Sequence, residues 1–182
     1  MKKIFVVDIE TDNLDHRMGS VLEIGIVSLD FDSGEIKPIF NEVIYENKKI
    51  NPEAWIFEHS NLKISDVYSA SKLDNYCIRL QRLFLEGFFT AFNQKFDFGW
   101  LKSRYFVIDL IWLDPMIILT PIMKLHHHYY GCKYPTVEEA YYYLFGENIV
   151  EEHRALPDAI VEAKMILKMY QEEYFFDKIE VK

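Results

Sequence analysis

The chain has 182 residues, of which half are hydrophobic and 16% are aromatic, and its formal net charge at pH 7 is −9. This composition is typical of one globular domain with a substantial core and excludes a disordered chain. The acidic balance argues against a broad basic face for long nucleic acid, although it is compatible with a small nucleic-acid site. No apolar run is long enough to span a membrane, and an apolar strand follows Met1–Lys3 at once, which leaves no room for a signal peptide. We therefore expect a cytoplasmic protein with no membrane partner, whose two distant cysteines, Cys77 and Cys132, are reduced.

The first ten residues join an apolar run, Ile4–Val7, to two carboxylates, Asp8 and Glu10. A continuous run of branched and aromatic residues predicts a central strand that is buried on both faces. Both carboxylates should project to one side from its C-terminal end, where open α/β sheets place their ligands. Paired carboxylates favour a hard cation such as Mg²⁺ or Mn²⁺. The pair predicts a metal site if further ligands follow, and otherwise a strand end that runs into a solvated loop.

The next segments predict an antiparallel meander. A polar loop over Thr11–Ser20 leads into an alternating strand over Val21–Phe31. Asp32–Gly34 is typical of a tight turn, and Gly34–Tyr45 should return as the partner strand, with Pro38 favouring a sheet edge.

The middle of the chain predicts helices between irregular connections. Asn51–Pro52 is typical of a helix start, and the nearby Trp55 either packs under a long connection or contacts a ligand. Ser71–Glu86 has the apolar spacing of an amphipathic helix, with Ser71 as its N-cap and Gly87 at its end.

Two further strands are expected around a helix. Phe88–Phe92 predicts a short strand, and Asn93 after it suits the N-cap of a helix that reaches about Tyr105. Asp97 would lie in the first turn, where the helix dipole favours a carboxylate, so Asn93 and Asp97 could simply start this helix. Val107–Leu113 predicts a fifth strand.

Two helices flank a histidine run in the next part of the chain. A short helix is expected over Met116–Leu125, and His126–His128 is interpreted as an exposed loop because three consecutive side chains cannot face one ion in regular structure. Thr136–Phe145 is predicted to be helical, with a capping box between Thr136 and Glu139.

The last helix is predicted to reach about Phe175, with Pro157 and Asp158 in its first turn and His153 in the loop before it. In a continuous helix, five residues would turn the two side chains about 140° apart. A loop histidine and a first-turn aspartate can instead reach one site. We assign one domain to residues 1–176 and a charged tail to residues 177–182.

Three motifs therefore occur in order, Asp8–Thr11, Asn93–Asp97 and His153–Ala159, and in this set the sequence resembles the DEDDh exonucleases. These form the DnaQ-like proofreading and RNA-trimming family of the ribonuclease H-like superfamily. Because a histidine stands five residues before the last aspartate, and Arg154 instead of a tyrosine stands four before it, the resemblance is to the DEDDh subclass. Further similarity lies in two short segments, Glu23-Ile24-Gly25 and Leu144-Phe145-Gly146, and in the single residue Asp114.

The resemblance implies an α/β, ribonuclease H-like fold: a five-stranded mixed sheet of order 3-2-1-4-5, with the second strand antiparallel and helices on both faces. It also implies a 3′-5′ exonuclease that releases nucleoside monophosphates from the 3′ ends of single-stranded DNA or RNA. A catalytically inactive nucleic-acid-binding or scaffold module of the same fold is the alternative. A ribonuclease H-like endonuclease is a third reading, but it would have no need of the His153 motif. A homodimer, or recruitment by a polymerase or a repair or RNA-processing partner, is left open.

The same resemblance assigns roles to the motif residues. Asp8 would bridge two divalent cations, Mg²⁺ or Mn²⁺, while Glu10 and Asp158 hold the ion that carries the attacking water. Asp97 would position the second ion, and His153 would be the general base.

Four other residues are expected to bind substrate, namely Thr11, Asn93, Phe96 and Trp55. Thr11 would lie at the terminal sugar, and aromatic rings would stack on unpaired bases. The chain has Thr11–Leu14 where many family members have Thr-Gly-Leu, which alters the loop beside the terminal nucleotide.

Overall fold

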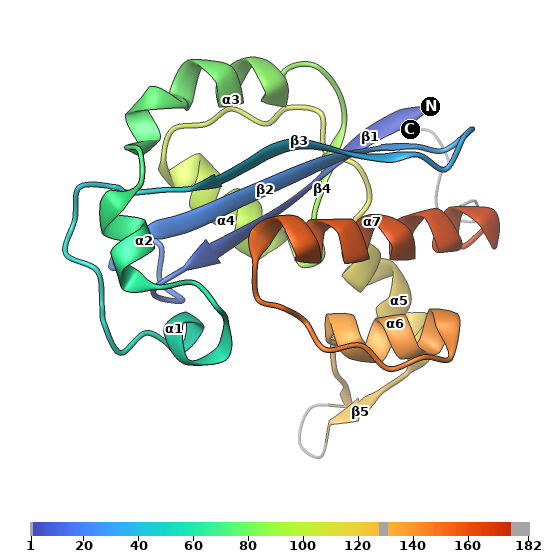
Figure 1. The fold of residues 1–182 in the computed structure, drawn as a ribbon. Coiled ribbons are helices and arrows are strands. Elements are labelled where there is room, and N and C mark those ends of the chain that lie inside the picture. The colour runs from blue at the N-terminus through green and yellow to red at the C-terminus, as the bar shows by residue number, and fades with distance from the viewer. Residues whose placement is uncertain (1, 128–130, 176–182) are drawn as a thin grey trace.

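The computed structural model describes residues 2–127 and 131–175 of the chain. At the centre of the fold is a four-stranded mixed sheet in the order β3-β2-β1-β4 (Figure 1). The strands are β1 (Lys3–Thr11), β2 (Val21–Asp30), β3 (Ile36–Val43) and β4 (Phe89–Thr90). β1 pairs antiparallel with β2 and parallel with β4, and β3 pairs antiparallel with β2. The α/β class, the antiparallel second strand and the edge position of Pro38 are confirmed.

The fifth strand that was predicted over Val107–Leu113 is not formed. This segment makes an isolated parallel bridge between Phe89 and Ile111, supported by two backbone hydrogen bonds of 2.8 Å. β4 is two residues long instead of the predicted five over Phe88–Phe92, so it offers almost no edge along which a fifth strand could pair. The segment runs beside β4, but the sheet order is 3-2-1-4 and not 3-2-1-4-5.

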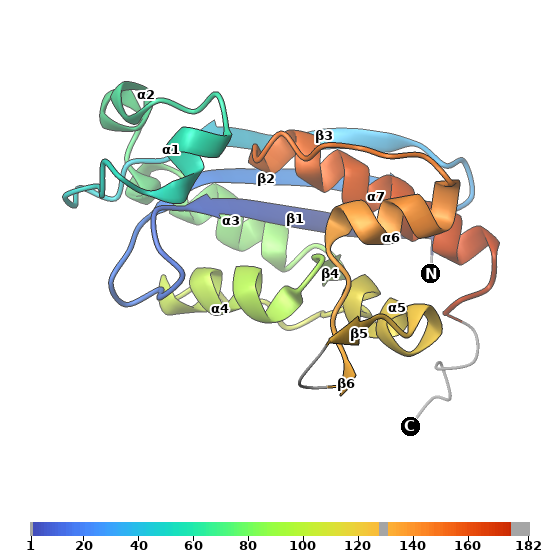
Figure 2. The same ribbon diagram turned by 90° about the horizontal axis from the view of Figure 1, so that it is seen from below.

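Helices cover both faces of the sheet (Figures 1 and 2), as predicted. α3 and α4 pack on one face, while α7 crosses the other and carries α5 and α6 on its outer side. The helical elements are α1 (Trp55–His59), α2 (Ile64–Ser69), the 3-10 turn η1 (Leu73–Asn75), α3 (Cys77–Phe84), α4 (Gln94–Ser103), α5 (Pro115–Met123), α6 (Val137–Phe145) and α7 (Ala155–Gln171). Among the described residues, no helix is long and apolar enough to cross a membrane.

The apolar run of β1 is continuous because the strand is buried from both sides. Ile4 and Val6 lie in the core beneath α7, whereas Phe5 and Val7 lie in the core beneath α3 and α4. All four side chains are at most 5% exposed. The prediction of a central strand is confirmed, and this packing fixes the direction in which the end of β1 delivers Asp8 and Glu10.

Several helix boundaries differ from the predictions. The helix expected over Ser71–Glu86 divides into η1 and α3, so Ser71 is not its N-cap, and α3 ends before Gly87. α7 ends at Gln171 instead of about Phe175. The capping box of α6 is confirmed: the Thr136 side chain accepts from the Glu139 N–H at 3.2 Å, and the Glu139 carboxylate accepts from the Thr136 N–H at 3.0 Å.

The start of α4 is capped by a residue from another segment. Asn93 occupies the N-cap position, but its φ is 73° and its side chain makes no cap hydrogen bond. The carboxylate of Asp114 instead accepts from the Gln94 N–H and from the Met116 N–H, each at 2.9 Å. One carboxylate thus caps both α4 and α5. This explains why Asp114 accompanies the three motifs.

The histidine run is not simply a loop. His126–His127 forms a two-residue strand, β5, which pairs antiparallel with β6 (Gly131–Cys132). His128 and the predicted tail at 177–182 lie outside the described residues. Cys77 and Cys132 are free thiols, as expected.

Candidate active site

Three elements meet where the central strand ends. The C-terminal end of β1 lies beside the N-terminal end of α7 and beside α1 (Figures 1 and 2). At this point Asp8, Glu10 and Asp158 each contribute a carboxylate oxygen, and the three oxygens lie within 4.8 Å of one another. The two predicted carboxylates of β1 and the first-turn aspartate of α7 are therefore brought together.

Among the described residues, no lysine or arginine forms an ion pair with Asp8, Glu10 or Asp158. Burial raises the pKa of Asp8 well above its ordinary value, and the neighbouring Glu10 raises it further. Burial, and then Asp158, raise the pKa of Glu10 from 4.5 to about 9. The Oδ2 atom of Asp8 is buried and has no hydrogen-bond partner among the described residues. Each of these properties is expected of a site that is completed by a cation.

Asp97 joins the same site from α4. Its side chain is 3% exposed, and its Oδ1 accepts a hydrogen bond of 3.2 Å from the N–H of Ile9, which stands between Asp8 and Glu10 on β1. Burial raises the pKa of Asp97, and its charge in turn raises the pKa of Asp8. Asp97 lies outside the group of three oxygens, but it faces the site and does more than start a helix.

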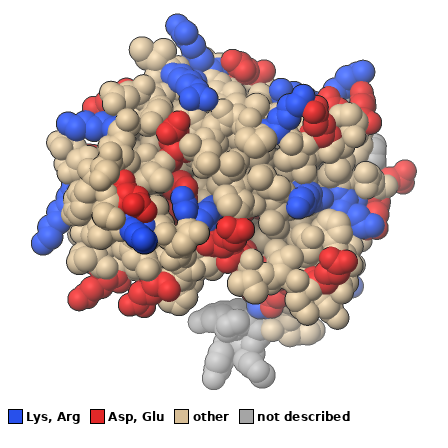
Figure 3. Space-filling view, viewed as in Figure 1, with Lys and Arg blue, Asp and Glu red and all other residues tan. Residues whose placement is uncertain are grey.

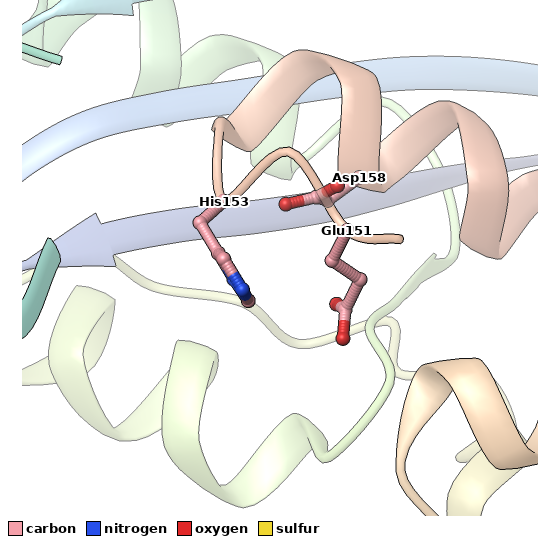
Figure 4. Close-up of side chains that lie close together, drawn as sticks. All are labelled: Glu151, His153 and Asp158. Carbon is pink, nitrogen blue, oxygen red and sulfur yellow. The ribbon is translucent and has the colours of Figure 1, made fainter. Parts of the chain in front are cut away.

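His153 lies in the loop before α7, as predicted, with a φ of 51°. Figure 4 shows its imidazole directed into the same space as the carboxylates of Glu151 and Asp158, and one ligand atom from each lies within 4.8 Å of the others. Burial, and then Asp158, raise the pKa of Glu151 to about 7. On another side the ring of Trp55 meets His153 edge to face, with centroids 4.6 Å apart, and Trp55 itself stacks on His59 at 4.1 Å.

The loop that carries His153 is held by β2. Glu23, which is 2% exposed, accepts from two nitrogens of the Arg154 guanidinium at 2.7 and 2.8 Å and from the Ala155 N–H at 3.1 Å. Arg154 also donates to Asn61 in the connection between α1 and α2. A Cβ on Gly25 would lie 2.3 Å from the backbone of Ala155, so only glycine permits this approach. The resemblance in Glu23-Ile24-Gly25 thus has a structural cause.

Sequence reasoning missed two acidic residues, Glu151 and Glu162. Glu162 is 3% exposed and accepts a hydrogen bond of 3.1 Å from the Phe92 N–H. Burial, and then Asp97, raise its pKa well above the ordinary value, and its own charge raises the pKa of Asp8. The signal was present in the sequence, because Glu162 follows Asp158 by four residues and so lies on the same face of α7.

The expected substrate contacts lie on two sides of the cluster. Asn93 and Phe96 line a hollow of about 270 Å³ between α4 and the loop after β1, together with His16, Lys95 and Trp100 among others. We call this the first hollow. The ring nitrogens His16 Nδ1 and Trp100 Nε1 are buried there without a partner among the described residues.

Thr11 and Trp55 lie elsewhere. The Thr11 hydroxyl donates to the Asn13 carbonyl at 2.8 Å at the end of β1. Trp55 is 54% exposed and lies beside His153. The structure therefore places Trp55 at the histidine and the other three residues at the end of β1 or on the flank of α4.

The charge on the surface agrees with the net charge of −9. On the face seen in Figure 3, lysine and arginine are interspersed with aspartate and glutamate, and no broad basic area is present on this face. This face therefore offers no continuous basic surface that could bind the phosphates of a long duplex.

An α/β sheet with helices on both faces, and with acidic side chains gathered at the end of the central strand, matches the fold of ribonuclease H-like exonucleases. The sequence matches the exonuclease family RNase_T over residues 5–166. The chain belongs to this family. The resemblance to DnaQ-like exonucleases is thereby confirmed, and the family is one of hydrolases.

Solved structures show the same fold at low identity. They include E. coli exonuclease I in complex with a dA16 oligonucleotide (TM-score 0.73, 13% identity, 97% of this chain and 43% of that one). Others are cell-death related nuclease 4, CRN-4 (TM-score 0.71, 15% identity, 94% and 64%), and a full-length 3′-exonuclease (TM-score 0.70, 15% identity, 94% and 61%). The chain thus spans less than two thirds of each of these proteins. A comparison with curated protein sequences gives no match.

Proposed function

We propose that the chain is a 3′-5′ exonuclease that hydrolyses phosphodiester bonds of single-stranded DNA or RNA and releases nucleoside monophosphates. The observation that carries this proposal is the gathering of Asp8, Glu10 and Asp158 within 4.8 Å, with His153 beside Asp158, in a chain of the exonuclease family. Exonuclease I and the 3′-exonuclease share the fold, and the former was solved with an oligonucleotide.

The residues fit two divalent cations, Mg²⁺ or Mn²⁺. Four carboxylates, from Asp8, Glu10, Asp97 and Asp158, would hold them, since hard cations take oxygen ligands and Asp8 Oδ2 has no other partner in the described part of the chain. When bound, the ions supply charge stabilisation to the phosphodiester and lower the pKa of water. Without the ions, burial and then repulsion by Asp158 favour the protonated form of Glu10, whose pKa they raise to about 9.

His153 would accept the proton of the attacking water. It has the position for this role because it lies in a loop beside Asp158 and outside the carboxylate group. The Glu23–Arg154 ion pair and the close approach of Gly25 to Ala155 fix the backbone where the loop meets α7. The ring of Trp55 packs against the imidazole and limits how far it can turn. The orientation of the base would thus be set from two elements, β2 and α1.

The 3′-terminal nucleotides would occupy the end of β1 and the first hollow. Thr11 would hold the terminal sugar, and Asn93 and Phe96 would contact the neighbouring nucleotide. Aromatic faces accept any base, which suits an enzyme that removes nucleotides regardless of sequence. Trp55 is proposed as a further stacking surface because half of it is open to solvent. Homodimerisation, recruitment by a partner and a cytoplasmic location stay predictions.

A time course tests this function. Single-stranded DNA and RNA of equal sequence, labelled at the 5′ end, are incubated in Mg²⁺, Mn²⁺ or EDTA with the wild type and with Asp8→Ala. We expect a ladder that shortens from the 3′ end, requires metal and is absent in the variant. Internal fragments would identify an endonuclease, and no cleavage of either polymer would favour an inactive binding module.

A further inference from the structure

A second hollow of about 520 Å³ adjoins the first one. His16 lines both hollows. The first reaches Asn93 and Phe96 near the start of α4, and the second reaches Arg104 and Tyr105 directly after its end. A helix of 10 residues is about 15 Å long, so the two hollows lie one after the other along α4, from its start near Asp97 to its end.

The second hollow is locally basic in an acidic chain. Four cationic side chains line it, Arg17, Lys48, Lys72 and Arg104, against two carboxylates, Glu46 and Asp74. Lys72 is exposed and makes no ion pair among the described residues. The side chain of Arg17 is 77% exposed although it pairs with Asp15. Lys72 and Arg17 can therefore reach an anion that enters the hollow.

An aromatic ring stands at the far end of the same hollow. Tyr105 is 93% exposed and has a φ of 66°, so its backbone adopts an unfavourable conformation and its ring packs against almost nothing. The core gains nothing from such a residue. A ring beside cationic side chains is the combination that binds single-stranded nucleic acid, through base stacking and phosphate contacts.

The walls of the hollow are already fixed. The Arg104 guanidinium bonds both carboxylate oxygens of Glu46 at 2.8 Å, the His16 carbonyl at 2.6 Å and the Gly19 carbonyl at 2.8 Å. These bonds tie the end of α4 to the loop after β1 and to the segment after β3. Arg104 therefore has a structural role. The side chains and loops that form the hollow would lose little conformational freedom when a ligand binds.

We propose that the second hollow binds the part of a single strand that lies 5′ to the nucleotides held at the active site, with Lys72 and Arg17 on its phosphates and Tyr105 under a base. This inference rests on the proposed function, because the polarity of the strand follows from cleavage at the 3′ end. The strand would run from the carboxylates through the first hollow into the second.

Binding and turnover on substrates of different length test the proposal. Affinity is measured by fluorescence anisotropy with a labelled dT10 in EDTA, and kcat/KM is measured in Mg²⁺ on dT10 and on the p-nitrophenyl ester of thymidine 5′-monophosphate, which is too short to reach the second hollow. The variants are Lys72→Glu and Tyr105→Ala, whose side chains are exposed, with Tyr105→Phe as the conservative form. Lys37→Glu is the control with the same change of charge. Lys37 is an exposed lysine at the start of β3, where it pairs with Glu35, and it lines neither hollow.

We expect Lys72→Glu to weaken dT10 binding roughly three- to tenfold and to reduce the dependence of log affinity on log salt by about 0.7. Tyr105→Ala should weaken it about fivefold or more, and Tyr105→Phe should restore it. Turnover of the ester should not change in any of these variants, nor dT10 binding in Lys37→Glu. Unchanged dT10 binding in both variants, or an equal loss on dT10 and the ester, would overturn the proposal. If dT10 binds through Lys72 and Tyr105 but the wild type cleaves neither substrate, the proposed catalysis fails and the binding path stands.

Discussion

Replacing Glu10 by glutamine should stabilise the metal-free protein while it destroys the metal site. The pKa of Glu10 is about 9 in the folded chain and 4.5 ordinarily, so the folded state binds its proton more tightly than the unfolded state does. Stability contributed by this proton is complete below pH 4.5 and is lost as the pH rises toward 9. At pH 7.5 the loss is about 4 kcal/mol if Glu10 titrates alone. Because neighbouring carboxylates share these protons, we expect about half of it.

Thermal unfolding measures this gain. In EDTA at pH 7.5, Glu10→Gln should unfold about 4 to 8 °C above the wild type, and the difference should vanish near pH 4.5. Mg²⁺ should reverse the order, because the wild type binds the ions and the variant binds them poorly. A variant that is equally or less stable in EDTA at pH 7.5 would refute the view that burial and the neighbouring carboxylates disfavour the charged form of Glu10. Glu86→Gln, which removes one carboxylate charge from an exposed residue, serves as the control for a general charge effect.

Four further substitutions test the rest of the site. His153→Ala should reduce kcat by about 10² to 10⁴ with little change in stability, which single-turnover kinetics and circular dichroism together would show. Gly25→Ala forces a Cβ against Ala155 and should lower both stability and kcat, so an unchanged kcat would mean that the loop tolerates displacement. Trp55→Ala should raise KM on single strands if the ring stacks on a base, and should lower kcat alone if the ring only holds His153. Trp55→Phe keeps an aromatic ring and should restore the wild-type value in either case. Glu162→Gln should retain the fold and most activity in a metal titration, because burial raises the pKa of this carboxyl and so favours its neutral form, which has nearly the shape of glutamine.

Local patterns predicted most of the fold. The run in β1, the turn before Gly34, the capping box of α6 and the loop before α7 each depend on neighbouring residues, and each was confirmed. The failure that changes the sheet was non-local. An apolar run such as Val107–Leu113 predicts a strand only if a partner edge exists, and β4 is too short to provide one.

The structure brings three of the predicted carboxylates together and adds neighbours that the sequence did not indicate. Asp8 and Glu10 were expected together from strand periodicity, and Asp158 was expected near them from the resemblance to the DEDDh exonucleases; the three lie close together in the structure. No local pattern indicates that Asp114 caps α4 or that Glu23 pairs with Arg154, because these contacts join segments that only the tertiary fold brings together. Glu162 could have been found by its helical spacing from Asp158.

The most direct test of the proposed exonuclease follows the order in which a strand loses its ends. A single-stranded oligonucleotide that carries different fluorophores on its 3′-terminal nucleotide and its 5′ end is incubated with the wild type and Asp8→Asn in Mg²⁺. We predict that the 3′ label is released first, as a mononucleotide, and that the variant releases neither label. Release of the 3′ label in longer fragments, or of the 5′ label first, would contradict the account.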